Sequence, residues 1–223
     1  MLTNANTATT SVAPQGFARR SLLGMVVVAA APLSRRALAE TAPEDATSTI
    51  KRFNGALLAA MKSGGRTDFS RRFQALAPEV DQAFDLSAVL SVSVGPGWAS
   101  LSPDQQSRLL DAFRRYTVAS YVANFDSYAG QDFTVSPDTR SLGADRVVVQ
   151  SRIVKISGDP TELDYVLKRT PSGWKVVDVL AGGSISRVAV QRSDFRRSLS
   201  RGGAPALANS LAAKSLRLSD GMS

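Results

Sequence analysis

The order of sequence patterns along the chain predicts an α+β fold, with helices gathered on one face of a curved antiparallel sheet. Apolar residues recur at helical spacing from Thr47 to about Tyr128, and they alternate with polar residues from Phe133 to Leu180. Helical spacing then returns towards the end of the chain. Four short strands at close intervals favour a meander, so the helices on either side are expected to pack on one sheet.

Four helices are predicted before the sheet. The first starts near Thr47, and the glycine pair at 64–65 stops it. The second spans Asp68 to Leu76 and is bounded by Pro78, and the third spans Asp81 to Val94. The fourth and longest is expected to run to about Tyr128.

A clear start signal precedes this longest helix. Ser102 is a suitable N-cap, Pro103 suits the first helical position, and Gln105 stands three residues after the cap. Large side chains then fall three to five residues apart, which predicts a broad, aromatic-rich face. The residues of this face are Leu109, Phe113, Tyr116, Tyr121 and Phe125.

Period-two alternation marks the strands, and glycine-containing turns separate them. The four predicted strands are centred on residues 133–135, 147–153, 163–167 and 174–180. Beyond Gly182-Gly183 the residues suit either a helix or an extended strand, and a helix capped by Ser184 is favoured. A final helix is expected from about Ala204 to Leu216.

Residues 1–39 resemble an export signal, which leaves 40–223 as a single domain. Arg19-Arg20 precede a short apolar core at 21–33, and Ala37-Leu38-Ala39 suits a signal peptidase. The block ARRSLLG resembles a twin-arginine signal without its usual Phe, so the secretory and twin-arginine routes both stay open. The signal therefore predicts export from the cytoplasm.

The composition gives little support for catalysis or for nucleic-acid binding. The net charge is +8, and four arginines of the signal account for half of it. The chain has no Cys and no His, so the usual ligands of zinc, iron and copper are missing and no metal site is expected. Ser48 and Lys51 match Ser-x-x-Lys by chance, and no phosphate loop appears. No catalytic residue and no cofactor are therefore expected.

Three stretches resemble the MlaC family of periplasmic phospholipid carriers: GWKVVDV at 173–179, GSIS at 183–186 and QRSDF at 191–195. The stretches FDL at 84–86 and VGPGW at 94–98 resemble the hopanoid-associated HpnM branch. The resemblance implies an NTF2-like cone, in which a four-stranded sheet and about six helices enclose an apolar cavity for acyl chains. Gln191 departs from the carrier pattern and leaves the lipid, phospholipid or hopanoid, open.

The resemblance also implies handover of lipid between an inner-membrane ABC transporter and an outer-membrane lipoprotein complex. Asp178 and Arg192 are expected to form a structural pair that fixes the last strand against the following helix. Twelve residues are candidates for the lipid-binding wall: Phe84, Leu90, Trp98, Phe113, Tyr116, Tyr121, Val149, Tyr165, Trp174, Val176, Val179 and Val188.

Three functions are weighed from these observations. The leading hypothesis is a soluble lipid carrier that performs no chemistry on its cargo. The alternatives are an NTF2-like enzyme acting on an isoprenoid or hopanoid, and an adaptor that binds a transporter and carries no lipid. The sequence alone does not distinguish a filled core from a hollow one, because apolar faces build both.

Overall fold

The computed structural model describes residues 45–64 and 67–220. The expected export signal at 1–39 lies outside these residues. Over the described ranges, no helix has both the length and the hydropathy needed to cross a membrane.

Two capped helices open the described part of the chain. α1, Ala46–Ser63, begins after Asp45, whose carboxylate accepts a hydrogen bond from the amide of Ser48 at 2.7 Å. α2, Phe69–Ala83, begins in the same way after Asp68. Each carboxylate satisfies an amide that has no partner inside its helix, and such a cap contributes about 1 kcal/mol.

α2 continues past Pro78, so the predicted end of this helix before the proline was wrong. Proline removes one helical hydrogen bond and is unfavourable inside a helix. The turn after it, however, buries Val80 and Ala83 almost completely in the core. This burial favours the helical path as far as Phe84, where a bridge to β4 begins.

The helix predicted over 81–94 is divided at Asp85. The first part is the end of α2, and the second is α3, Leu86–Val94. Asp85 caps α3 by accepting a hydrogen bond from the amide of Ala88 at 2.9 Å. A short 3-10 helix follows, η1, Gly95–Ser100, and Gly95 allows this change of direction with its φ of 81°.

The longest unbroken helix, α4, spans Pro103–Asn124. Its capping box is confirmed: the side chain of Ser102 accepts from the amide of Gln105, and the side chain of Gln105 accepts from the amide of Ser102. The helix ends four residues before the predicted Tyr128, because Phe125 leaves helical geometry at φ −123° and ψ 51°.

The chain then forms a purely antiparallel meander in the order β1-β2-β3-β4-β5. The strands are β1 Asp132–Ser141, β2 Arg146–Val154, β3 Thr161–Thr170, β4 Gly173–Ala181 and β5 Ile185–Ser186. The expectation of four strands was wrong, because the residues after Gly182-Gly183 turn back and pair with the end of β4 before any helix begins.

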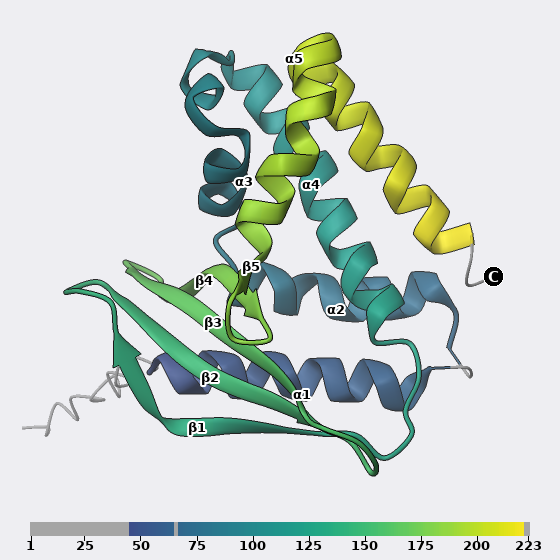
Figure 1. Cartoon of the computed structure of the whole chain (residues 1–223). Helices are drawn as coiled ribbons and strands as arrows, with labels where there is room; N and C mark the ends of the chain where they lie inside the picture. The colour runs from purple at the N-terminus through teal and green to yellow at the C-terminus, as the bar shows by residue number, and fades with distance from the viewer. Residues whose placement is uncertain (1–44, 65–66, 221–223) are drawn as a thin grey trace, which may run out of the picture. The chain divides into compact units, whose positions relative to one another are not determined.

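The last element, α5, spans Arg187–Asp220 and is broken by non-helical geometry at Gly202 and Gly203. The two helices predicted in this region are therefore both present. With the broken α5 counted as one element, the structure has five α-helices and one 3-10 helix within the described ranges, against the expected number of about six helices. α5 packs against α4 and α3, and these helices stand over the end of the sheet formed by β4 and β5 (Figure 1).

The helices cover the sheet face that carries the odd-numbered residues of β2 and β3. Asn54 of α1 donates a hydrogen bond to Ser151 of β2 at 2.9 Å, and the rings of Phe53 and Tyr165 meet edge to face with centroids 6.4 Å apart. The buried core lies along this face, as the pleat of a half-covered sheet requires.

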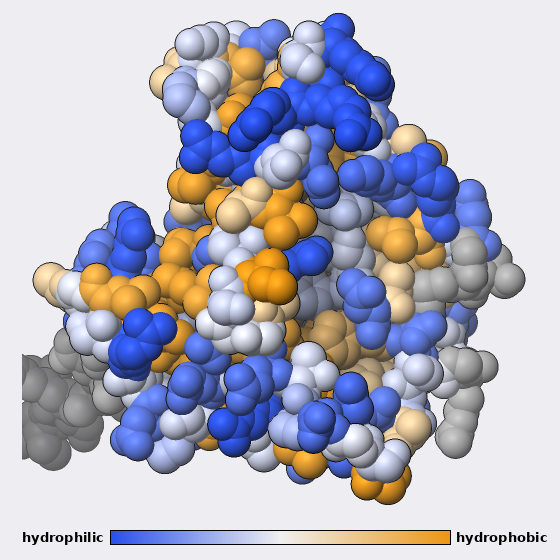
Figure 2. Space-filling view, in the orientation of Figure 1, coloured by the Kyte–Doolittle hydropathy of each residue, from blue (hydrophilic) through white to orange (hydrophobic). Residues whose placement is uncertain are grey.

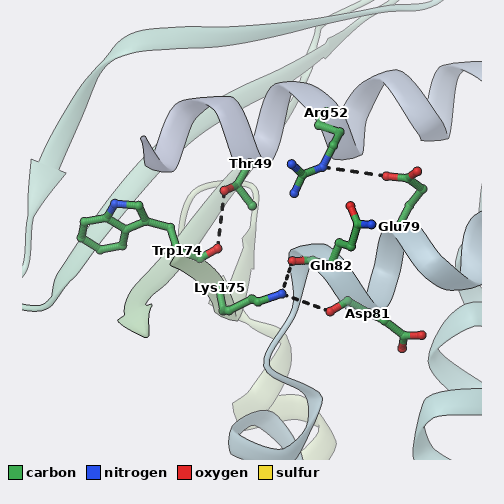
Figure 3. A network of polar contacts seen from close by, with 7 residues as sticks. All are labelled: Thr49, Arg52, Glu79, Asp81, Gln82, Trp174 and Lys175. Carbon is green, nitrogen blue, oxygen red and sulfur yellow. Dashed lines mark hydrogen bonds and ion pairs between the residues drawn. The ribbon is translucent and has the colours of Figure 1, made fainter. Parts of the chain in front are cut away.

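A polar network joins β4 to α1 and α2 (Figure 3). The ammonium of Lys175 donates to the carbonyl oxygens of Asp81 and Gln82 at the end of α2, where a cation complements the helix dipole. Thr49 of α1 donates to the carbonyl oxygen of Trp174 at 3.4 Å. The start of β4 is thereby fixed beneath both helices, which also sets the position of the cavity wall described next.

Candidate functional site: an apolar cavity over the sheet

A cavity of about 340 Å³ lies between the sheet and the helices. Its wall takes side chains from α3, α4, β2, β3, β4 and α5, and most of them are apolar. Figure 2 shows hydrophobic atoms at the floor of a hollow in this face of the molecule, bordered by hydrophilic side chains. The interior is thus not completely filled by its own side chains, and an apolar ligand is the kind that such a space accepts.

α4 contributes one side of the wall. Phe113, Tyr116 and Tyr121 of the predicted aromatic face all reach the cavity, and so does Phe125 just beyond the helix. Leu109, the first residue of this face, is fully buried in the core instead. One face of α4 contacts both the packed core and the cavity. Helical periodicity alone therefore could not distinguish the core residues of this face from the cavity residues.

The sheet contributes the opposite side. Thr161, Leu163 and Tyr165 alternate along β3 on the helix-covered face, and Val179 and Ala181 continue the wall on β4. A register shift between Val166 and Leu167 changes the pairing of β3 with β4 near this position. Such irregularities bend a strand locally, and the bend favours a hollow over the sheet.

The start of α5 closes the third side with Arg187, Val188 and Gln191. Asp178 of β4 holds it in place: one carboxylate oxygen accepts from the amide of Val188 at 3.1 Å, and the other accepts from the hydroxyl of Ser186. The cap expected from Ser184 is therefore supplied by Asp178 and Ser186.

The predicted pair of Asp178 and Arg192 is not formed. The oxygens of Asp178 are engaged at the start of α5, as above, and Arg192 points elsewhere. Its guanidinium lies close to Gly95, where an added Cβ would be 3.4 Å from it. Five positions into the helix, Arg192 has turned away from the strand that carries Asp178.

The pKa values of two tyrosines in the cavity wall indicate surroundings that disfavour charge. Burial raises the pKa of Tyr121 well above its usual value, and the positive charge of Arg187 opposes this only in part. Burial also raises the pKa of Tyr165. Both side chains consequently remain neutral phenols at physiological pH.

Seven of the twelve wall candidates line this cavity, and whether any of the twelve contacts lipid stays a prediction. Those seven are Phe84, Phe113, Tyr116, Tyr121, Tyr165, Val179 and Val188. Leu90, Val149 and Val176 are fully buried in the packed core. Trp174 holds Arg169 over its ring at 4.9 Å, and Trp98 belongs to η1, where its carbonyl accepts from Gln106.

The sequence reasoning missed several residues of the wall. Thr117 and Ser120 lie four residues after Phe113 and Tyr116, so helical spacing could have found them. Thr161 and Leu163 share the strand face of Tyr165 and could have been found by parity. Thr117, Ser120 and Thr161 are small or polar, so their residue types alone do not indicate an apolar wall.

The described residues contain no group of three or more acidic side chains arranged to hold a metal ion. Asp178 is the one carboxylate among the side chains found in the cavity wall. Its oxygens already accept hydrogen bonds from Val179, Ser186 and Val188. The site therefore offers a ligand apolar surface and hydrogen-bonding groups. The carboxylate of Asp178 is instead engaged in hydrogen bonds within the fold.

Comparison with known proteins agrees with this architecture. No curated protein matches the chain. A solved structure from Ralstonia solanacearum, described as a phospholipid-binding protein in complex with a phospholipid, is similar with a TM-score of 0.68. It is 24% identical, and the match covers 78% of this chain and 99% of that one. Residues 51–213 match the family described as MlaC protein, and the chain belongs to that family.

Proposed function

We propose that this protein binds a lipid and carries it, with hydrocarbon held in the cavity between the sheet and α3, α4 and α5. The observation that supports this most strongly is the cavity itself, about 340 Å³ lined mainly by apolar side chains. Membership of the MlaC family supports it, and so does the fold shared with a protein described as holding a phospholipid.

The physical chemistry of hydrocarbon burial suits this use. Each CH₂ group removed from water contributes about 0.8 kcal/mol, so a long acyl chain binds without any charged anchor. The cavity is small, because ligand sites span roughly 300–1,000 Å³. A lipid with two acyl chains therefore requires the helices over the sheet to move apart as it enters.

The finer parts of the proposal rest on the sequence and on family membership. We place the protein in the periplasm after export, in the hopanoid-associated HpnM branch and in an NTF2-like architecture. There it passes phospholipid or hopanoid between an inner-membrane ABC transporter and an outer-membrane lipoprotein complex. A binding role is favoured over the enzyme alternative because the carboxylate in the wall, Asp178, is committed to capping α5.

A cavity-filling variant tests the proposal. Ala181 lines the cavity near the end of β4, whereas its neighbour Leu180 points to the other face of the strand. We expect Ala181→Phe to lower the lipid recovered with the purified protein about tenfold or more, because the added ring occupies the space for hydrocarbon. Leu180→Phe, which adds bulk on the opposite face, is expected to retain its lipid.

The readout is organic extraction of the purified, signal-free protein followed by mass spectrometry, with circular dichroism as the check on folding. Equal lipid content in a folded Ala181→Phe protein and in the wild type would contradict a cargo in this cavity. A wild-type protein that is empty yet binds a transporter would favour the adaptor, and turnover of added lipid would favour the enzyme.

A further inference from the structure

The part of α5 before its break carries a concentration of positive charge. Residues 187–201 contain five arginines and a single acidic residue, so the segment has a net charge of +4. The whole chain carries +8, and four of its arginines lie in the expected signal. The rest of the chain therefore has no more net charge than this one segment. Its arginines are Arg187, Arg192, Arg196, Arg197 and Arg201.

The fold does not use these charges. All five arginines are exposed, and within the described ranges none of them forms an ion pair, even with Asp194 of the same segment. Arginines of other elements do have acidic partners: Arg114 of α4 pairs with Asp81, and Arg152 of β2 lies 3.4 Å from Glu162. The guanidinium groups of α5 are thus available to an anionic partner outside the molecule.

The spacing of the residues places charge and apolar surface on the outer side of the helix. Val188 and Phe195, seven residues apart, are buried and fix the inner side. Val190, Arg197 and Arg201 are separated by seven and four residues, so they share the outer side. Val190 is 37% exposed, and Ile185, just before the helix, is 60% exposed. Hydrophilic side chains gather over the upper part of α5 (Figure 2).

A helix surface of this kind, basic with a few exposed apolar side chains, is typical of proteins that lie on an anionic bilayer. The segment is about 20 Å long at 1.5 Å per residue, so its charges meet several lipid head groups at once. A protein partner fits less well, because the centre of a protein–protein interface is depleted in charged residues. Charge complementarity therefore favours a lipid surface as the occupant.

We propose that the outer side of α5 before the break, with Val190 and its arginines, docks the protein on the surface of a bilayer that contains anionic lipids. The start of the same helix closes the cavity with Arg187 and Val188, so docking brings this side of the cavity to the bilayer. The inference goes beyond the proposed function and does not depend on what the cavity holds.

The test is co-sedimentation of the signal-free protein with lipid vesicles. One set of vesicles contains phosphatidylcholine alone, and the other contains equal parts of phosphatidylcholine and phosphatidylglycerol. We expect the protein to bind the anionic vesicles about tenfold more strongly or better at low salt. Added salt should release it, because the screening length falls from about 30 Å at 0.01 M salt to about 3 Å at 1 M.

Two double variants separate the helix from the overall charge. Arg196→Gln with Arg197→Gln removes two charges from α5 and should weaken binding to anionic vesicles about tenfold or more. Arg146→Gln with Lys155→Gln removes the same charge from exposed positions at the two ends of β2, which lies two strands away from β4 in the sheet. This control should keep most of the binding, and circular dichroism checks that both variants are folded.

Three outcomes would overturn the inference. Equal weakening by the two double variants would show attraction by net charge without a docking surface on α5. Binding that salt does not weaken would assign the contact to apolar insertion. A wild type that ignores anionic vesicles at low salt would leave an acidic protein surface as the partner of these arginines. The proposed function fails separately, because it is measured as lipid extracted from the purified protein, which docking does not change.

Discussion

Asp164 and Asp178 are strand carboxylates with different roles. Asp178 organises the start of α5 through hydrogen bonds from Ser186 and Val188. Asp164 lies in a polar groove of the sheet with Gln150, Arg152 and Glu162. It is 8% exposed, and burial together with the nearby charge of Glu162 raises its pKa above the usual value of 3.8. Its ionised form is consequently disfavoured in the folded protein.

The raised pKa of Asp164 predicts the sign of a pH effect. The folded state holds this proton more tightly than the unfolded state, so stability falls as pH rises from 3.8 through the raised folded pKa. Asp164→Asn removes the free-energy cost of ionising this carboxyl in the folded protein, and it keeps the side-chain hydrogen bond with Gln150. We expect the variant to exceed the wild type in free energy of unfolding at neutral pH.

Urea unfolding at several pH values measures this difference. Well below pH 3.8 the advantage of Asp164→Asn should vanish, because both states of the wild type are then protonated. Asp159→Asn, in an exposed turn, is the control and should change little at any pH. An advantage of Asp164→Asn that does not depend on pH would contradict the assignment to ionisation.

At the scale of elements, the break in α5 decides how the C-terminal end of the described chain packs. Gly203 has φ 63° and ψ −155°, a conformation open almost only to glycine. The break changes the direction of the chain, and the second half of α5 then buries Leu207 and Leu211 in the core. The sequence favoured a helix before the break and predicted a separate one from about Ala204, where Pro205 suits a helix start.

Substitution of this glycine tests the importance of the break. We expect Gly203→Ala to lower the free energy of unfolding by about 1–3 kcal/mol, the usual cost of a side chain forced into such backbone geometry. Gly97→Ala is the matched control, because an added Cβ meets no atom within 4 Å there. Chemical denaturation measures the free energy of unfolding of both variants. Equal stability of the two variants would contradict a requirement for glycine at position 203.

The helices and strands were predicted correctly where contacts between sequence neighbours determine the structure. They were predicted incorrectly where packing between distant parts of the chain determines it. The capping box at Ser102 and Gln105 needs only neighbours in sequence, and the structure confirms it. Pro78 was expected to end a helix, but burial of the following turn outweighs its local effect. A strand was considered for the residues after Gly182-Gly183 but a helix was favoured, because the two-residue strand β5 is supported by its pairing with β4 and not by a local pattern.

At the scale of the whole molecule, the cavity could not be predicted from the spacing of apolar residues in the sequence. Val149 and Tyr165 are direct partners on one sheet face, yet Val149 is enclosed in the core while Tyr165 lines the cavity. Strand parity gives the face of a side chain, but its surroundings depend on which helix lies above it. α1 packs over part of this face, and the cavity lies where α3, α4 and α5 stand over the rest.

Site-specific photo-crosslinking tests the central claim, a lipid inside this cavity, most directly. A benzophenone amino acid replaces Tyr121, which lines the cavity, or Tyr128, which is 45% exposed and lies outside it. After irradiation of protein loaded with phosphatidylglycerol, intact-mass analysis should find the lipid attached at position 121 and not at position 128. Attachment at 128 alone, or none at 121 in a folded, lipid-loaded protein, would contradict a lipid held in this cavity.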